Sequence, residues 1–499
     1  MDSSASKNSP QPQANLSNDK FEDELLEVIN RRLGIVVKQS QLTDLHQIVK
    51  DSCQKLQCSE TDYLDALNKA SDDSSILKDL INGITIGETY FFRDQKQMHL
   101  LKQIILPEII ARKRKLNDLS LRIWSAGCAS GEELYSIVIM LDEMLVDLDA
   151  WHLHLLGTDI NAKVLQKALS GQYSEWSMRA INDFYKNKYL QHTGQYYLLD
   201  KKIIKQAEFG YLNLNDHSYP SIVNGTSALD LILCRNVLIY FDAVHTREIM
   251  KKFSLCLVEG GYLLLGASDP VEVENMDLVL KAEHGKLLGR TSVTQATIAK
   301  TASKDVAKIK SNLDQIVAKP KQKSVPVTKI PEVNFPQLIK QSRWAEILNI
   351  IDQYPKEKYQ TAEVLSAKAE ALANLGRLKE AAEYCENSLK QDPIKLSTYF
   401  TYAMILIGLN EYKRAEAALR KTLFLDRDFV LGHYQLGLML IRNNELATGL
   451  KSLKNAYEIT QKKDATLAVP GYENLTYGKL TDILQKEIQL HEVESHETE

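Results

Sequence analysis

The sequence has few of the features that mark secreted, metal-binding or membrane proteins. Its six cysteines are scattered, with no Cys-x-x-Cys pair and no cysteine–histidine cluster at metal-ligand spacing. No apolar run approaches the ~20 residues that span a bilayer, and the polar N-terminus has no apolar signal core. We therefore expect a cytoplasmic protein without a metal site and without membrane insertion.

An excess of charge of one sign is also missing. The 61 Lys and Arg residues nearly balance the 65 Asp and Glu residues, for a formal net charge of −4. The chain therefore gives no overall electrostatic reason to bind nucleic acid. At 499 residues it is too long for one ordinary core, so two or three domains are expected.

Changes in composition and periodicity divide the chain into six parts. Ser, Asn, Gln and Pro dominate the start, which predicts disorder, and a later lysine-rich stretch with weak periodicity predicts a flexible linker. Amphipathic helical patterns lie on either side of a segment in which strand-like apolar runs alternate with helices. The expected parts are a disordered N-terminus (1–19), a helical domain (20–85), an α/β domain (86–290), a linker (291–333), helical repeats (334–464), and a capping helix with an acidic tail (465–499).

Short apolar runs alternate with helical patterns between residues 86 and 290. "LRIWSAG", "WHLHLLGTDI", "ALDLILCRNVLIYF" and "GGYLLLGAS" are typical of buried parallel strands. This alternation predicts a doubly wound, Rossmann-like sheet with right-handed crossovers. Residues 185–212 favour an inserted antiparallel subdomain. The predicted fold class is α/β in the middle of the chain and all-α at both ends.

The C-terminal third repeats itself every 34 residues. Small residues recur at this step in three columns, and small residues at fixed points let two helices cross closely. A helix–turn–helix period of 34 with such columns is the tetratricopeptide signature, and predicts a solenoid. The columns are Ala369, Ala403 and Gly437; Ala381, Ala415 and Gly449; and Ser388, Thr422 and Ala456.

Three segments should meet at the carboxyl edge of the sheet, where such folds bind ligands. In "WSAGCASGEE" (124–133), a strand runs through two glycines into a helix that begins with Glu132 and Glu133. Carboxylates at a helix N-terminus suit the helix dipole but disfavour a phosphate. A ligand with ammonium, sulfonium and ribose hydroxyl groups fits this segment better.

The other two segments leave alternatives open. Asp159 ends the second strand and either accepts ribose hydroxyls or, like Asn161, caps the next helix. Arg235 and Asn236 interrupt an apolar strand before Tyr240. Buried polar groups need partners, which here are either a ligand edge or loop carbonyls.

Five segments, "GETYFFRD", "WSAGCASGEELYSI", "GTDI", "LNL" and "CRNVLIYF", occur in this order. Together they resemble the CheR family, the S-adenosylmethionine-dependent glutamate O-methyltransferases of bacterial chemoreceptors. The resemblance covers about residues 20–290, and the repeats resemble an extension of some members. In "GETYFFRD", the aromatic pair is expected to pack into the domain junction while Thr89 and Arg93 face the ligand.

The resemblance implies a set of site residues. It assigns Arg93 and Tyr240 to the neighbourhood of the transferring methyl group. It also implies that the cofactor is S-adenosylmethionine, with S-adenosylhomocysteine as product. Many family members carry asparagine where this chain has Gly87, which removes one side-chain contact. The implied cofactor contacts are Thr89, Arg93, Glu132, Asp159, Asn213, Leu214, Arg235 and Asn236.

The implied reaction is methyl transfer to a glutamate of the cytoplasmic domain of a methyl-accepting chemotaxis receptor. A glutamate with a pKa of ~4.3 is ionised at neutral pH, so no strong general base is required. The five segments contain no histidine, which agrees with this. In the family a basic helix faces the receptor. The corresponding stretch here has few basic residues, with only Lys50 and Lys55 beside Asp44 and Asp51. An unidentified peptide or protein on the repeat face is a second expected partner.

Two other functions remain open from the sequence. One is a scaffold whose cofactor site has decayed, with the repeats as its functional part. The other is a small-molecule methyltransferase or a nicotinamide enzyme on a similar fold, which explains the order of strands and helices but not "TYFFRD" or "CRNVLIYF". Binding of S-adenosylhomocysteine separates the first of these from an active enzyme.

Overall fold

The structure is a computed structural model that describes most of the chain between residues 13 and 496. The gaps within it are 71–73, 217–218, 275, 283–285, 291–332, 341–342, 354–360, 444 and 471. The predicted linker (291–333) thus lies almost wholly outside the described residues. Helix α1 begins at Gln13, inside the stretch 1–19 for which we expected disorder, and residues 1–12 are not described.

The N-terminal helices form a small unit with its own core, which we call the helical head. Its apolar faces bury Leu25, Leu45 and Leu67 together. Helix α3 begins with a capping box, in which Ser59 and Asp62 exchange hydrogen bonds. The helices of the head are α1 (Gln13–Leu33), α2 (Leu42–Leu56), α3 (Glu60–Lys69) and α4 (Ser75–Ile84).

A seven-stranded sheet forms the centre of the molecule, in the order β6-β2-β1-β7-β8-β10-β9. The first five strands pair in parallel, and β10 and β9 pair antiparallel at one edge. The strand order reverses at β1, which pairs with β2 on one side and β7 on the other. This confirms the doubly wound α/β prediction. The strands are β1 (Ser120–Ala126), β2 (His152–Asp159), β6 (Ala207–Tyr211), β7 (Leu229–Cys234), β8 (Leu257–Leu265), β9 (Leu278–Ala282) and β10 (Leu287–Arg290).

Helices cover the sheet and connect its strands. A long helical segment precedes β1, and its middle turn, η2 (Leu101–Ile105), is a π-helix. The apolar faces of these helices bury two clusters against the sheet, one around Ile123 and one around Trp124. The covering helices are α5 (Gln95–Leu100), α6 (Leu106–Lys115), α7 (Glu132–Met144), α8 (Ala162–Ser170) and α11 (Ala243–Cys256). Short helical turns are η1 (Gln39–Gln41), η3 (Leu148–Ala150), η4 (Glu175–Met178) and η5 (Leu238–Tyr240).

The inserted antiparallel subdomain is present, but its extent differs from our expectation. A three-stranded sheet in the order β3-β5-β4 forms it, together with α9 (Asp183–Tyr189) and α10 (Lys201–Ile204). Residues 207–211, which we had included in it, instead form β6 and pair with β2 in the central sheet. The three strands are β3 (Gln172–Tyr173), β4 (Leu190–Thr193) and β5 (Tyr196–Leu199).

Antiparallel helix pairs form the C-terminal part, which we call the repeat array. Ala369, Ala403 and Ala415 are fully buried where helices cross, which agrees with the 34-residue columns. Its elements are α13 (Phe335–Lys340), α14 (Trp344–Gln353), α15 (Ala362–Asn374), α16 (Leu378–Gln391), α17 (Leu396–Gly408), α18 (Tyr412–Leu425), α19 (Val430–Arg442), α20 (Leu446–Gln461), β11 (Ala468–Val469), β12 (Tyr472–Thr476) and α21 (Tyr477–His496).

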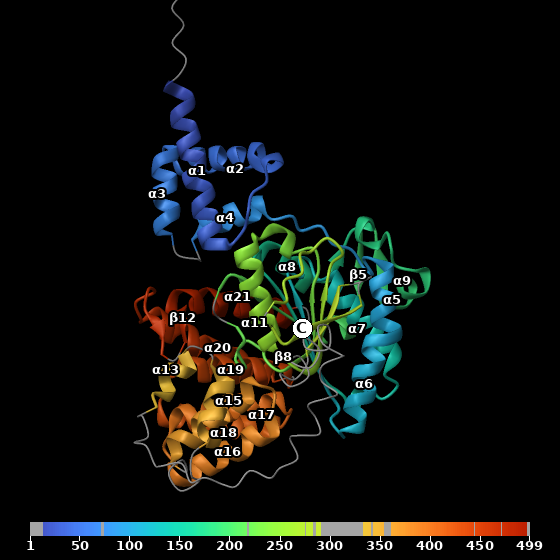
Figure 1. The fold of residues 1–499 in the computed structure, drawn as a ribbon, viewed down its shortest axis with the longest axis vertical. Helices are drawn as coiled ribbons and strands as arrows, with labels where there is room; N and C mark the ends of the chain where they lie inside the picture. The colour runs from blue at the N-terminus through green and yellow to red at the C-terminus, as the bar shows by residue number, and fades with distance from the viewer. Residues whose placement is uncertain are drawn as a thin grey trace, which may run out of the picture.

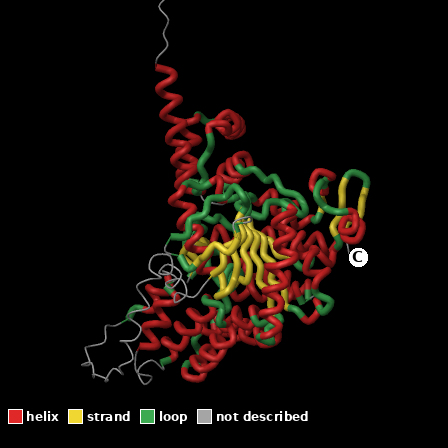
Figure 2. Tube along the Cα trace, turned by 45° about the vertical axis from the view of Figure 1, so that its right-hand side comes forward, coloured by secondary structure: helices red, strands yellow, loops and turns green. Residues whose placement is uncertain are grey.

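The parts are arranged around the central sheet. The helical head lies above the sheet in Figure 1 and the repeat array lies below it. Figure 2 shows the same arrangement from the side, with the strands between the two helical parts. No helix in the described part of the chain is both long enough and apolar enough to cross a bilayer.

Candidate functional site

A pocket opens where the carboxyl ends of β1, β2 and β7 face the helical head. This is the point at which the strand order reverses, as expected for ligand sites in open α/β sheets. The head contributes one wall through Leu33, Ile35 and Val37, and the segment after α4 contributes another. The strand ends supply the remaining walls through residues such as Asp159 and Arg235.

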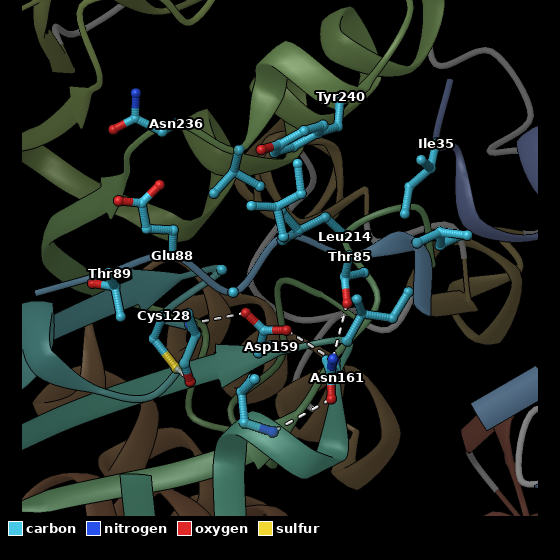
Figure 3. Close-up of a pocket in the computed structure, with 18 of the residues that line it drawn as sticks. Ile35, Thr85, Glu88, Thr89, Cys128, Asp159, Asn161, Leu214, Asn236 and Tyr240 are labelled. Carbon is cyan, nitrogen blue, oxygen red and sulfur yellow. Dashed lines mark hydrogen bonds between the residues drawn. The ribbon is translucent and has the colours of Figure 1, made fainter. Parts of the chain in front are cut away.

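The sequence left open whether Asp159 caps the next helix or faces a ligand, and the structure assigns the cap to Asn161. Asn161 is the N-cap of α8, and its Oδ1 accepts the backbone N–H of Lys163 at 2.9 Å. Asp159 is therefore not needed as a cap and lines the pocket (Figure 3). Its carboxylate accepts the backbone N–H groups of Ala129 at 2.9 Å and of Asn161 at 2.8 Å. Burial raises the pKa of the Asp159 carboxyl above its usual value.

The first two residues of α7 have different surroundings. Glu132 is fully buried and does not line the pocket, because Ser130 and Ser177 donate hydrogen bonds to its carboxylate at 2.7 and 2.9 Å. Glu133 does line the pocket. Of the two glutamates, the structure therefore brings Glu133 to the pocket and not Glu132, which we had predicted as a cofactor contact. Side chains of adjacent residues on a helix point about 100° apart. A small difference between the expected and the observed orientation of α7 therefore decides which of the two glutamates faces the pocket.

Arg235 is buried directly after β7, where hydrogen bonds join it to three other residues. Its guanidinium donates to Gln97 Oε1 at 2.6 Å, to Glu133 Oε2 at 2.9 Å and to the Arg93 carbonyl at 2.6 Å. Glu133 also accepts the Ser125 hydroxyl at 2.7 Å. The five donors of an arginine suit such a branched role. This network fixes the Glu133 carboxylate and the Arg93 backbone at the pocket wall.

The "TYFFRD" segment forms part of the pocket wall, and its two phenylalanines anchor it. Phe91 packs edge-to-face on Tyr173 and Phe92 stacks on Tyr185, each with ring centroids 4.9 Å apart. Both phenylalanines are buried, whereas Thr89 and Arg93 line the pocket. The strong aromatic anchor explains why this surface segment needs both apolar and charged residues.

Arg93 and Tyr240 face the pocket from opposite elements. The Arg93 guanidinium donates to the Glu88 carbonyl at 2.7 Å, which holds the side chain along its own loop. Tyr240 ends η5, and its carbonyl accepts the backbone N–H of Val36 from the helical head at 2.8 Å. Burial raises the pKa of the Tyr240 hydroxyl, and the positive charge of Arg93 opposes that rise. The phenol therefore stays protonated at neutral pH and is a hydrogen-bond donor.

The remaining predicted contacts lie on two turns. Asn213 donates its amide to the Arg32 carbonyl at 3.1 Å, so it joins the sheet to the head. The turn that carries Asn213 and Leu214 is held by Lys252, which donates to the Leu214 and Asp216 carbonyls at 2.7 Å each. Burial lowers the pKa of Lys252 to about 8. Asn236 lines the opposite wall, with φ at +60° and its backbone N–H donated to Asp269.

The pocket thus collects seven of the eight predicted cofactor contacts, all except Glu132, together with Tyr240. Sequence reasoning named no residue of the head among the site residues, and it missed the supporting roles of Gln97 and Lys252. No local motif marks these residues, since their roles follow from tertiary contacts. Among the described residues, no group of three or more His, Cys, Asp or Glu side chains is placed to hold a metal ion.

Comparisons with known proteins agree with this geometry. Residues 87–285 match the family described as CheR methyltransferase, SAM binding domain, and residues 362–395 and 396–429 each match a tetratricopeptide repeat. The chain is 34% identical over 229 residues to a chemotaxis protein methyltransferase of Borreliella burgdorferi, across 45% of this chain and 79% of that relative.

Two further relatives give similar figures. Identity to chemotaxis protein methyltransferase 1 of Pseudomonas aeruginosa is 37% over 196 residues, across 38% of this chain and 68% of the relative. Identity to chemotaxis protein methyltransferase 2 of Vibrio cholerae is 38% over 195 residues, across 39% of this chain and 65% of the relative. All three matches cover half of this chain or less.

Proposed function

This chain belongs to the chemotaxis protein methyltransferase family, and from that membership we propose that it methylates glutamate side chains of methyl-accepting chemotaxis receptors. The methyl donor in this proposal is S-adenosylmethionine. The observation that supports it most is the pocket at the reversal point of the sheet, which gathers residues from six separate segments. Because receptor signalling domains lie in the cytoplasm, the proposal also places this protein there.

The residues around the pocket fit this donor by their chemistry. The Asp159 carboxylate lies at the end of β2, where it can accept ribose hydroxyls. The Ile35 and Val164 side chains offer apolar surface to an adenine ring. When bound, the donor supplies an electrophilic methyl group on a positively charged sulfur.

The residues of this chain then act by positioning rather than by proton transfer. The receptor glutamate is ionised at neutral pH, so the chain does not have to remove a proton. We propose that Tyr240 and Arg93 hold the carboxylate oxygen that does not attack, which orients the other oxygen toward the methyl group. The Arg93 guanidinium already donates to the Glu88 carbonyl, so its hold on the substrate orients without fully neutralising it.

The repeat array is proposed to contribute protein docking. Helix α2 carries only Lys50 and Lys55 beside Asp44 and Asp51, a nearly balanced charge. A receptor with an acidic surface therefore gains little attraction from this helix. Docking through a second surface compensates for that, and tetratricopeptide arrays offer such surfaces.

The proposal is tested by incubating the full chain with methyl-labelled S-adenosylmethionine and purified receptor cytoplasmic domains. We expect label in the receptor as an ester that alkali releases. Receptor domains with the methylated glutamates changed to alanine are the matched control and should take up no label. Transfer to no receptor encoded in the same genome would contradict the proposal.

The decayed-scaffold alternative is separated by a binding measurement. Gly87 lines the pocket and adds no side-chain contact there, which is the observation that favours this alternative. Isothermal titration with S-adenosylhomocysteine should give saturable binding if the site is active. A scaffold with a decayed site would give no heat of binding above dilution.

A further inference from the structure

The loop that carries three pocket residues also reaches the repeat array. Residues 212–228 connect β6 to β7, and the loop's first residues, Leu212 to Leu214, line the pocket. The Tyr219 hydroxyl donates to the Leu214 carbonyl at 2.7 Å, and the Tyr219 ring packs on Trp124. A hydrogen bond therefore joins Leu214 at the pocket to Tyr219, and Ile222, which packs on the array, follows three residues later.

The tip of this loop is inserted among the helices of the array. Ser221 and Thr226 close the tip with two hydrogen bonds, at 3.0 and 3.1 Å. Ile222 packs against both apolar clusters of the array, one centred on α15 and α16 and the other on α17 to α20. Val223 packs against the second cluster, and its carbonyl accepts the Gln435 side-chain amide from α19 at 3.3 Å.

A second contact brings the backbone of the array against the sheet. Gly376, in the turn between α15 and α16, has φ at +85°. A Cβ atom there would come within 2.9 Å of Val258 and 3.1 Å of Ala228. These two residues lie at the amino ends of β8 and β7. The array therefore rests on the edge of the sheet opposite the pocket.

A third contact reaches the helical head. Lys78 of α4 forms an ion pair with Asp482 of α21 at 3.0 Å, and both side chains are about two-thirds covered. Helix α4 leads directly into Ile84 and Thr85 at the pocket wall. The array and its last helix thus contact elements on two sides of the pocket, namely loop 212–228 and α4.

We propose that the repeat array is an internal brace of the cofactor pocket. By taking up the loop tip at Ile222 and Val223, it fixes the turn that presents Asn213 and Leu214. The face of α19 that holds this tip is occupied by the chain itself. An external protein that binds there must displace the tip, and so loosens the pocket.

The brace proposal rests on the proposed use of the pocket for S-adenosylmethionine. Its test distinguishes a failure of the brace proposal from a failure of the proposed function. The variants are Ile222→Glu, which places a charge between the two clusters, and Gln435→Ala, which removes one hydrogen bond. Val146→Glu is the matched control, because Val146 is 99% exposed in the same domain. Each full-length variant is measured by small-angle X-ray scattering and by titration with S-adenosylhomocysteine, with circular dichroism as the check on folding.

We expect Ile222→Glu to increase the radius of gyration and to weaken binding of S-adenosylhomocysteine by about tenfold, within the usual range for coupled sites. Gln435→Ala should shift both measurements in the same direction by less, and Val146→Glu should shift neither. The proposal is overturned if the array separates without a change in affinity. It is also overturned if scattering stays unchanged in both variants. Absence of binding by the unsubstituted chain contradicts the proposed function instead, and leaves the scattering test of docking intact.

Discussion

At the residue scale, Arg235 shows why one charged side chain can be indispensable in a core strand. Three separate acceptors surround its guanidinium, on Gln97, on Glu133 and on the Arg93 backbone. A lysine keeps the charge but cannot reach three acceptors in different directions. Two buried acceptors would then lose their partner, which is more costly than losing the hydrogen bonds alone.

We therefore predict that Arg235→Lys lowers the free energy of unfolding by about 2–4 kcal/mol and abolishes measurable binding of S-adenosylhomocysteine. Urea unfolding and isothermal titration give the two readings. Arg247→Lys is the control, since Arg247 is 54% exposed and its ion pair with Glu272 is 3.7 Å long. The control should stay within about 0.5 kcal/mol of the unsubstituted chain. Equal effects of the two substitutions would contradict the role given to Arg235.

Asp159 allows a second prediction, because its carboxylate is expected to accept ligand hydroxyls in its ionised form. Asp159→Asn keeps the size but loses the charge and half the acceptors, so S-adenosylhomocysteine should bind roughly 10- to 100-fold more weakly. Asp149→Asn, at an exposed position, should bind normally. Burial raises the pKa of Asp159. Affinity should therefore begin to fall, as pH decreases, at a higher pH than an ordinary aspartate would give.

The residue scale also marks the limit of reasoning from sequence. The motifs predicted Thr89, Asp159, Asn213 and Arg235 at the pocket, because a strand end or a turn leaves one direction for each side chain. Glu132 and Glu133 are adjacent at a helix start, and only the final orientation of α7 decides which one faces the ligand. Gln97 and Lys252 act through tertiary contacts that no local pattern encodes.

At the element scale, helix crossings in the repeat array depend on the absence of side chains. A Cβ atom on Gly437 would come within 2.6 Å of Leu453 and 3.0 Å of the Gly449 carbonyl. Gly437→Val should force α19 and α20 apart and lower the free energy of unfolding by about 1–3 kcal/mol. Thermal unfolding followed by circular dichroism measures this. Gly210→Val, where nothing lies within 4 Å, should cost far less, and an equal cost would contradict the crossing argument.

Helix α15 carries a buried charge that should make stability depend on pH. The residue as a whole is partly exposed, yet burial of its carboxyl raises the pKa of Glu370 to about 7. Below the unfolded value of 4.5, both states are protonated and burial has no electrostatic cost. As pH rises toward 7, only the unfolded state ionises, so the folded state loses stability.

The prediction is that Glu370→Gln stabilises the protein by about 1–3 kcal/mol above pH 7, after allowance for partial exposure, and has no effect below pH 4.5. Denaturant unfolding at several pH values measures the difference between the two proteins. Glu383→Gln, on the exposed side of α16, should show no such dependence. Stabilisation that is constant across pH would contradict an electrostatic origin.

Elements were easier to predict than their contacts. Runs such as "LRIWSAG" have enough hydrophobic character to predict buried strands, and the 34-residue step predicted the helix pairs of the array. The antiparallel strands β9 and β10 were missed; they are only five and four residues long, and β9 lies at the edge of the sheet. Docking of the array on the sheet was missed as well. It depends on a small residue at 376 and an aliphatic tip at 222, which look ordinary in a sequence.

At the scale of the whole molecule, the pocket has walls from parts far apart in the chain. The head contributes Ile35, the segment after α4 contributes Glu88, and the sheet contributes Asp159 (Figure 3). Backbone contacts such as the Val36 N–H to the Tyr240 carbonyl join the head to the sheet. A ligand that fills this pocket therefore stabilises the arrangement of the parts as well as their individual folds.

Hydrogen exchange of the full chain tests whether the ligand stabilises the head, the sheet and the array together. Saturating S-adenosylhomocysteine should slow exchange of backbone amides in residues 33–41 and 84–89, since both stretches form pocket walls. Coupling between two sites is reciprocal. If the array braces the pocket, the ligand must in turn slow exchange in residues 219–226 and in α19, the elements that carry the contact.

The Ile222→Glu variant separates direct from transmitted protection. At saturating ligand its pocket walls should still be protected, because Ile222 does not line the pocket. Protection of α19 should disappear, because the contact of Ile222 and Val223 with the array is its only proposed route from the pocket. Protection of α19 that persists in this variant would show that the ligand reaches the array by another path, such as the ion pair of Lys78 with Asp482.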